Sequence, residues 1–258
     1  MNFPINKQRV RESFDRAAAA YDESALIQRR ICERLIDEFI LSDPPPLNIL
    51  DAGCGTGFGA QLMQKRWPKA EVICTDFAPS MLKYARKFSK TCCAADIEYL
   101  PFISSHFDLW WSNLTIQWCE LPYVFSEAKR ILKPGGYAVF STLVTDTFFE
   151  LRQAFAEIDD YQHTLSFCSQ ESINKNLLKA GFNRFTLVRE KHTIFYPDLK
   201  FLLRAIKAIG ANTIGQGGRS GMMGRSSWVK LQATYEEMRG QEGLPITYDV
   251  ILGYVKNE

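Results

Sequence analysis

The sequence predicts an α/β fold in which helices flank one open, mostly parallel β-sheet. Three observations support this prediction. Apolar strand-like segments alternate with helical segments between residues 48 and 142, a glycine-rich turn follows the first strand, and acidic side chains end the first three strands. The chain has 258 residues, 46% of them hydrophobic, so it can bury the core that such a sheet requires.

Two amphipathic helices are predicted before the sheet, within residues 7–40. Apolar side chains recur there at helical spacing, at Val10, Phe14, Ala17 and Tyr21 in the first helix and at Ile27, Ile31, Leu35 and Phe39 in the second. These stripes are first of all packing faces. Tyr21 lies where the first helix should give way to Asp22, and a hydroxyl at such a break can reach across a ligand pocket.

The segment N-I-L-D-A-G-C-G-T-G at residues 48–57 is the most informative one. A strand runs into Asp51, and the glycines that follow let backbone approach a ligand closely. A dinucleotide fingerprint needs glycine where Phe58 stands, and a phosphate-binding loop needs Lys-Ser or Lys-Thr after the turn. An acid at the strand tip repels a pyrophosphate and attracts an ammonium, so we expect a cationic amino acid at this turn. The string resembles the first motif of class I methyltransferases, in which the turn wraps the methionyl part of S-adenosylmethionine.

Later strands also end in polar side chains. A strand at 71–75 ends at Asp76, about 25 residues after Asp51, and a helix begins near Pro79. A third strand at 91–95 ends at Asp96 and Ile97. The remaining elements are a strand at 107–112 that ends at Asn113, a helix at 123–132, a Lys-Pro-Gly-Gly turn at 133–136 and a fifth strand at 137–142.

The ends of parallel strands meet at one edge of a sheet, where ligands bind. We therefore expect Asp76 to accept hydrogen bonds from the ribose hydroxyls and Asp96 to accept from the adenine amine, with Ile97 on the ring. The full set of predicted cofactor-binding residues is Asp51, Gly53, Gly55, Gly57, Asp76, Phe77, Met81, Asp96, Ile97, Asn113 and Gln117.

After the fifth strand, the pattern predicts helices at 148–158 and 169–180, a sixth strand at 183–196 and a last strand at 247–255. An insert at 198–240 separates these two strands, with helices at 198–209 and 227–239 around a glycine-rich loop at 210–224. We therefore predict a single domain, 1–258, with a Rossmann-like seven-stranded sheet. Residues 7–40 form N-terminal helices, residues 47–196 and 244–258 form the core sheet, and the insert forms a helical lid.

The insert is basic. From Asp198 to Lys230 the only acid is Asp198, against the cations Lys200, Arg204, Lys207, Arg219, Arg225 and Lys230. A solvated helix face explains isolated lysines, but this clustering beside a glycine-rich loop indicates an anionic partner.

Composition excludes several classes of function. The formal net charge is only +2, so the chain lacks the footprint of a nucleic-acid binder. No apolar stretch is long enough for a membrane span, and residues 1–10 lack the apolar core of a signal peptide, so we expect a cytoplasmic protein. We also expect a monomer. Seven cysteines form no Cys-x-x-Cys pair and have no histidine at ligand spacing, so no metal site is predicted.

Three segments resemble the malonyl-acyl-carrier-protein O-methyltransferases of biotin synthesis. They are F-D-R-A-A-A-A-Y-D at 14–22, S-N-L-T-I-Q-W at 112–118 and A-I-G-A-N at 208–212. The resemblance spans nearly the whole chain. It implies methylation of the free carboxylate of a malonyl thioester on acyl carrier protein, with S-adenosylmethionine as the methyl donor. The loop at 215–224 is richer in glycine than is usual for this family.

A carboxylate acceptor is already ionised at pH 7, so methyl transfer to it needs no general base and depends on alignment. Candidates for orienting the acceptor are Tyr21, Asn113, Gln117, His163 and His192. The cations Arg204, Lys207, Arg219 and Arg225 could serve the carboxylate, or could bind the carrier together with Lys200.

Two alternatives stay open at this stage. A quinone-type C- or O-methyltransferase would share the core but not the basic insert. A cofactor-binding regulatory protein without catalysis is disfavoured by the intact set Asp51, Asp76, Asp96 and Asn113. Amide or exocyclic-amine methylation is less expected, because Leu114 and Thr115 follow Asn113 in place of two prolines and an aromatic residue.

Overall fold

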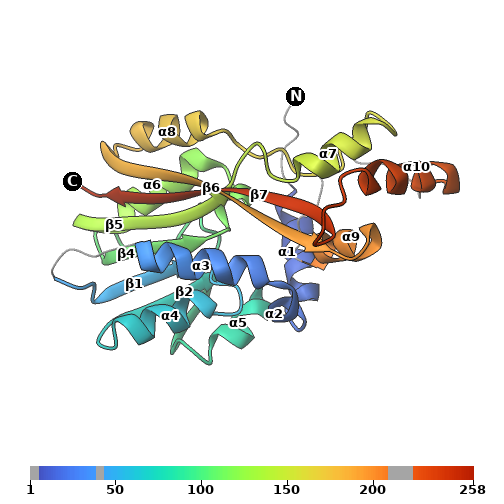
Figure 1. Ribbon diagram of the computed structural model, residues 1–258. Helices are drawn as coiled ribbons and strands as arrows, with labels where there is room; N and C mark the ends of the chain where they lie inside the picture. The colour runs from blue at the N-terminus through green and yellow to red at the C-terminus, as the bar shows by residue number, and fades with distance from the viewer. Residues whose placement is uncertain (1–5, 39–43, 209–222) are drawn as a thin grey trace.

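The structure is a computed structural model that describes residues 6–38, 44–208 and 223–258. Within these residues, seven strands form one sheet in the order β3-β2-β1-β4-β5-β7-β6 (Figure 1). The strands are β1 (Asn48–Ala52), β2 (Glu71–Asp76), β3 (Thr91–Ala94), β4 (Phe107–Asn113), β5 (Leu132–Leu143), β6 (Arg184–Tyr196) and β7 (Leu244–Lys256). The first five pair in parallel, and β7 runs antiparallel to both β5 and β6. The predicted Rossmann-like sheet is confirmed.

Helices join the parallel strands at the predicted places, as α4 (Phe58–Arg66), α5 (Pro79–Ala85) and α6 (Leu121–Ile131). A short 3-10 helix, η1 (Ile116–Trp118), follows β4. Further along lie α7 (Phe149–Ala156), α8 (Gln170–Lys179), α9 (Leu199–Ala208) and α10 (Arg225–Glu236). The Ser169 side chain caps α8 by accepting a hydrogen bond from the Ser172 N–H, and Gly181 follows the helix with a φ of +85°.

The N-terminal prediction is corrected in one respect. The first helix, α1 (Lys7–Ala17), ends before Tyr21, which begins a separate short helix, α2 (Tyr21–Ser24). The second predicted helix is α3 (Leu26–Glu38), and Phe39 lies outside the described residues. The break turns the chain, and Tyr21 still packs edge-on against Phe14 of α1, with 6.3 Å between the ring centroids.

The expected turn at residues 133–136 is also corrected. β5 begins at Leu132 and pairs in parallel with β4 on both sides of the segment, where the register shifts between Phe107 and Leu109. The segment is therefore a bulge and does not reverse the chain. Asn257 holds it, because its amide donates to the carbonyls of Leu132 and Lys133.

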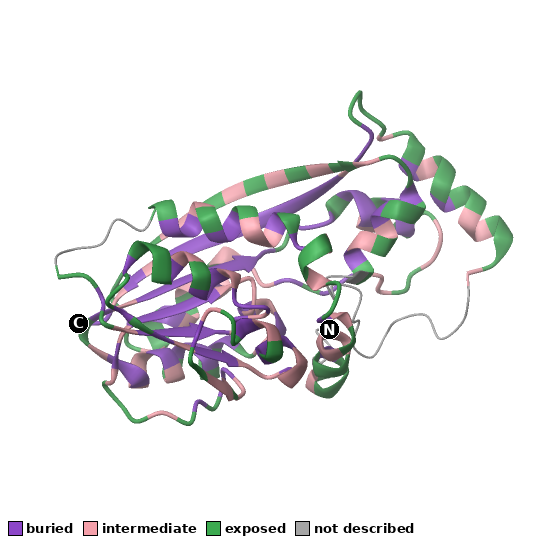
Figure 2. Cartoon of the chain, turned by 90° about the horizontal axis from the view of Figure 1, so that it is seen from below, coloured by how far each residue is buried: buried purple, intermediate pink, exposed green. Residues whose placement is uncertain are grey.

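Both faces of the inner strands of the sheet are buried, whereas the edge strands β3 and β6 have no fully buried residue. Ile49 and Leu109 pack in one core cluster, whereas their neighbours Leu50 and Trp110 pack in a second cluster on the opposite face. Figure 2 shows buried strands enclosed by helices with exposed outer faces. Two buried faces explain why these strands are continuously apolar in sequence. None of the described helices is long and apolar enough to cross a membrane.

Candidate functional site

A pocket with about 680 Å³ of empty space, part of it open to solvent, lies at the carboxyl ends of β1 to β4. It brings together nine of the predicted cofactor or acceptor residues, namely Tyr21, Gly53, Gly55, Asp76, Phe77, Met81, Asp96, Ile97 and Asn113. Helix α1 adds Lys7, Val10 and Phe14 to the lining. The segment after β4 adds Leu114, Thr115, Trp118 and Cys119, and Ala95 completes it. The sequence predicts the apolar face of α1 only as core packing, and no pattern in it marks Lys7 as a site residue.

The glycine turn has one glycine facing the cavity and one facing the protein. Gly55 has a φ of +54°, and a Cβ placed there would lie 3.9 Å from Tyr21 Cε1 on the cavity wall. Gly57 has a φ of +92°, but a Cβ there would lie 2.8 Å from the Ala85 Cα in α5. Gly57 therefore packs the turn against α5 and does not line the cavity, in contrast to the role predicted for it.

Asp76 ties the glycine turn to the start of α5. Its carboxylate accepts hydrogen bonds from the N–H of Gly55 (2.9 Å) and from the N–H of Ala78 (2.8 Å). Burial raises the pKa of Asp76 to about 6 in spite of these hydrogen bonds. Each carboxylate oxygen keeps a second lone pair, so Asp76 can still accept from two ligand hydroxyls.

Asp51 lies in a second cavity, which shares Tyr21, Gly53, Gly55 and Asn113 with the first. It is 2% exposed, and burial raises its pKa to about 7. Within the described part of the chain, four buried side-chain atoms around this cavity have no hydrogen-bond partner: Asp51 Oδ2, Gln28 Oε1, Arg29 Nε and Trp111 Nε1. Buried polar atoms are normally paired, so this cluster indicates a polar ligand.

The other end of the first cavity carries acidic side chains, and these are paired with a lysine. Asp96 accepts from Lys7 Nζ (2.6 Å) and from the N–H of Glu98 (3.0 Å), and Lys7 also contacts the buried Glu98 at 2.7 Å. Ile97 beside them is 6% exposed. The N-terminal helix α1 is thereby fastened to the end of β3.

The amides of Asn113 and Gln117 are engaged by the protein itself. Asn113 Nδ2 donates to the carbonyl of Gln28 (3.1 Å), and Asn113 Oδ1 accepts from Ser141 Oγ (2.7 Å). Gln117 Nε2 donates to the carbonyl of Leu114 (2.6 Å), and Gln117 does not line either cavity. Asn113 therefore holds α3 against β4 and keeps one amide N–H free of this contact. Gln117 stabilises the segment after β4 through its hydrogen bond to Leu114.

Neither predicted histidine reaches the two cavities. His163 stacks on Phe155 at 3.6 Å between ring centroids, contacts Asp159 Oδ1 at 2.6 Å and lines a separate cavity with Arg152. His192 lies on β6 beside Glu190, where burial lowers its pKa. Position in the sequence gave no sign that both would pack away from the strand ends.

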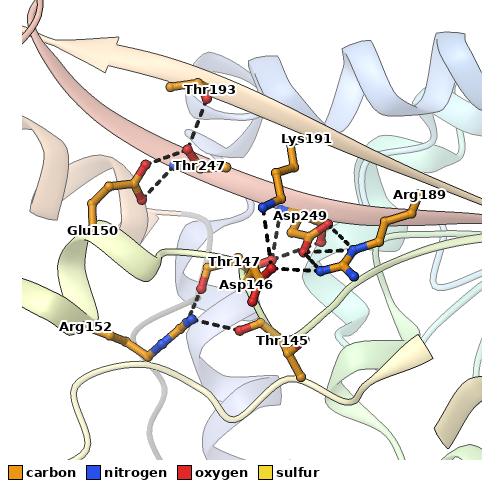
Figure 3. A network of polar contacts seen from close by, with 10 residues as sticks. All are labelled: Thr145, Asp146, Thr147, Glu150, Arg152, Arg189, Lys191, Thr193, Thr247 and Asp249. Carbon is orange, nitrogen blue, oxygen red and sulfur yellow. Dashed lines mark hydrogen bonds and ion pairs between the residues drawn. The ribbon is translucent and has the colours of Figure 1, made fainter. Parts of the chain in front are cut away.

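A polar network joins the segment after β5 to the strands β6 and β7 (Figure 3). Arg189 Nε on β6 donates to the buried Asp249 on β7 (2.9 Å), and its guanidinium also pairs with Asp146 (2.9 Å). Glu150 on α7 accepts from the N–H of Thr247 (3.1 Å), and Arg152 donates to the carbonyls of Thr145 and Thr147. The network fixes α7, and we assign it no contact with a ligand.

The predicted carrier-binding cations lie mainly on α9. Lys200, Arg204 and Lys207 are exposed at positions i, i+4 and i+7, opposite the buried Leu202 and Ile206. Among the described residues, none of the three forms an ion pair. α9 also packs against α2, which carries Tyr21. Arg225 begins α10 and is exposed, whereas Arg219 lies outside the described residues.

Within the described residues, no group of three histidine, cysteine or acidic side chains could hold a metal ion. The seven cysteines are free thiols.

Comparison with known proteins finds similar methyltransferases. The family model of a methyltransferase domain matches residues 50–140. A malonyl-[acyl-carrier protein] O-methyltransferase of Dechloromonas aromatica is 45% identical, covering 97% of this chain and 95% of the relative. The enzyme of the same name from Laribacter hongkongensis is 40% identical over 98% of this chain and 90% of its own length. A bifunctional biotin biosynthesis protein of Saccharophagus degradans is 38% identical over 95% of this chain and 46% of that protein.

Solved structures share the fold at low identity. A methyltransferase of Thermotoga maritima that depends on S-adenosylmethionine superposes with a TM-score of 0.58 at 18% identity, covering 96% of this chain and 99% of that one. A phosphoethanolamine N-methyltransferase of Haemonchus contortus, solved with S-adenosylhomocysteine, superposes with a TM-score of 0.59 at 17% identity. The match covers 95% of this chain and 58% of that one.

Proposed function

Because this chain belongs to the family of malonyl-[acyl-carrier protein] O-methyltransferases, we propose that it esterifies the free carboxylate of a malonyl thioester on acyl carrier protein, an early step of biotin synthesis. The chain is an S-adenosylmethionine-dependent methyltransferase. The observation that carries the acceptor assignment is the extent of the similarity. It covers 97% of the chain and so includes the N-terminal helices and the insert, outside the methyltransferase domain at 50–140.

The two joined cavities suit the two ends of the cofactor. We assign the adenosyl end to the first cavity, with the ribose hydroxyls on Asp76 and the adenine beside Asp96 and Ile97. The amino-acid end is a zwitterion and needs both an anion and a cation. Asp51 and Arg29 supply them in the second cavity, where both have unpaired buried atoms. The sulfonium of the bound cofactor supplies the methyl group.

The protein contributes by orienting the acceptor and by excluding water from the site. Phe14, Leu114 and Trp118 are apolar walls of the first cavity that exclude water from the acceptor. Burial raises the pKa of Tyr21, so its hydroxyl stays protonated and can donate a hydrogen bond to a carboxylate. We assign Tyr21 to orienting the acceptor, together with Asn113, which lines the same two cavities.

Intact-mass analysis tests the proposed function. The purified protein is incubated with S-adenosylmethionine and malonyl-acyl carrier protein, and the carrier should gain the mass of one methylene group. Acetyl-acyl carrier protein, which lacks the free carboxylate, is the control and should stay unchanged. Methylation of a free quinone precursor in place of the malonyl carrier would support the small-molecule alternative. Cofactor binding without transfer to any acceptor would support a regulatory protein.

We expect the cations of α9 to distinguish carrier-bound from free substrate. Replacing both Lys200 and Arg204 with Glu should raise the KM for malonyl-acyl carrier protein about tenfold, and raise that for malonyl-coenzyme A much less. The reason is that an acidic carrier protein meets the whole charged face, whereas coenzyme A meets it only through its phosphates. The effect should shrink in high salt, because the Debye length falls from about 10 Å at 0.1 M to about 3 Å at 1 M.

The matched control is the double replacement of Lys175 and Lys179 with Glu on α8. These lysines are exposed and have the same i, i+4 spacing, so they change the net charge equally. Equal losses in the two double variants, or equal losses on both substrates, would show that α9 is not the carrier surface.

The affinity for S-adenosylhomocysteine should rise as the pH increases from about 5 to about 8. Burial raises the pKa of Asp51 to about 7 and that of Asp76 to about 6, and only the ionised acids bind an ammonium or two hydroxyls well. In the ligand-free protein the sign is opposite. The folded state keeps protons that the unfolded state releases above about pH 4, so these acids lower the free energy of unfolding as the pH rises toward 7.

Calorimetric titrations at several pH values check this dependence. Asp51→Asn should bind more weakly and lose the part of the pH dependence that lies nearest to 7. An affinity of the unchanged protein that stays constant over the range would contradict the assignment of these acids to the cofactor.

A further inference from the structure

The N-terminal segment 7–28 contacts the end of every strand that forms the cofactor cavities. We call this segment the cap. Each contact is polar and joins the cap to a different part of the sheet edge: Lys7 to Asp96 after β3, Asp15 to the N–H of Ser80 after β2, Asp22 to Thr56 after β1, and the carbonyl of Gln28 to Asn113 at the end of β4. The cap therefore covers the edge where the cofactor binds.

The contact of Asp22 is the one nearest to Tyr21. Thr56 Oγ1, in the glycine turn, donates to Asp22 Oδ1 at 2.7 Å, and Arg29 Nη2 of α3 lies 3.3 Å from the same oxygen. Thr56 is only 6% exposed, so its hydroxyl depends on this acceptor. Arg29 also lines the second cavity, its buried Nε has no hydrogen-bond partner, and its Cζ lies 5.1 Å from the centroid of the Phe58 ring.

The helix that carries Tyr21 needs such an anchor. α2 has four residues, Tyr21–Ser24, and no side-chain cap at its N-terminus. A single helical turn is unstable without tertiary contacts. The Tyr21 ring nevertheless forms a wall shared by both cavities, which places it between the two ends of the assigned cofactor.

We propose that Asp22 is a positioning residue, which holds Tyr21 over the cofactor through Thr56 and Arg29. The proposal rests on the proposed function for the identity of the acceptor. It adds a coupling between the two cavities: Arg29 lines the second cavity, to which we assign the amino-acid end of the cofactor, and Arg29 Nη2 pairs with Asp22. Ligand contacts to Arg29 in the second cavity therefore also stabilise the position of α2 and of Tyr21.

The competing view is that this is an ordinary surface ion pair. The Asp22 side chain is 51% exposed and that of Arg29 is 38% exposed, and exposed pairs contribute little to stability. The two views differ in what they predict for kinetics. A surface pair should affect neither turnover nor cofactor release, whereas a positioning contact should affect both while stability changes little.

The test compares Asp22→Ala, Thr56→Val and Tyr21→Phe with the double variant of Asp22→Ala and Tyr21→Phe. At saturating cofactor, each single variant should lower kcat about tenfold, and the double variant should lose no more than Tyr21→Phe alone. Thr56→Ser keeps the hydroxyl and should retain most of the activity that Thr56→Val loses. Glu23→Gln is the matched control, because Glu23 is an exposed acid in the same helix.

The second readout does not need an acceptor. The rate of S-adenosylhomocysteine release, followed by stopped flow, should rise several-fold in Asp22→Ala and Thr56→Val and stay unchanged in Glu23→Gln. Release at the rate of the unchanged protein, or additive losses of kcat in the double variant, would overturn the positioning role. If the unchanged protein does not methylate malonyl-acyl carrier protein, the proposed function fails, and the release rates still decide the role of Asp22.

Discussion

Replacing Asp76 with alanine should weaken the binding of S-adenosylmethionine more than a hundredfold, a loss of about 3 kcal/mol or more. Two causes act together. The variant loses the acceptor of two ribose hydroxyls, and it also loses the carboxylate that holds the N–H groups of Gly55 and Ala78. The glycine turn and the start of α5 would then lose their common anchor.

Calorimetric titration with S-adenosylhomocysteine measures this effect. Glu71→Ala is the matched control, because Glu71 is an exposed acid at the start of the same strand. It should bind like the unchanged protein. A folded Asp76→Ala variant with normal affinity would remove Asp76 from the cofactor site.

Gly55→Val should abolish cofactor binding by occupying ligand space. Except for Tyr21 Cε1 at 3.9 Å, no protein atom lies close to where its Cβ would be, so the side chain would project into the cavity. The positive φ of Gly55 adds backbone strain of about 1 kcal/mol or more, which alone would reduce stability without blocking the ligand.

Gly135→Val separates these two effects. Gly135 also has a positive φ, +82°, and nothing lies within 4 Å of the position of its Cβ. Both variants should unfold at lower denaturant concentration, but only Gly55→Val should lose the cofactor. Comparable affinities in the two variants would mean that the turn does not cradle the ligand.

The local pattern of apolar residues was sufficient to predict the parallel strands at the core of the fold. The inner parallel strands β1 and β4 are buried and read as short apolar runs, and an acid or amide marks the carboxyl end of each of the strands β1 to β4. Because parallel strands place those ends on one edge, Asp76, Asp96 and Asn113 could be brought together from sequence order alone. Boundaries were less certain where a strand tolerates irregularity, as at the bulge before Tyr137.

The acceptor side could not be predicted in the same way. His163 and His192 have suitable chemistry as donors, but their positions depend on how α7 and β6 pack, and both face other neighbours. Gly57 and Gln117 belong to motifs, yet each satisfies a contact within the protein. A motif identifies which residue types gather at a turn, but the orientation of each side chain depends on the helices that pack over it.

The sequence by itself determined the sheet, the glycine turn and the acids at the strand ends, because these follow from local periodicity and from the geometry of parallel strands. Only the tertiary structure decided the rest of the site. Lys7, Gln28 and Arg29 lie on N-terminal helices far from the strand ends in sequence, as the separation of 89 residues between Lys7 and Asp96 illustrates. Their contacts arise because the cap folds across the sheet edge, and buried charges there need partners that no local pattern specifies.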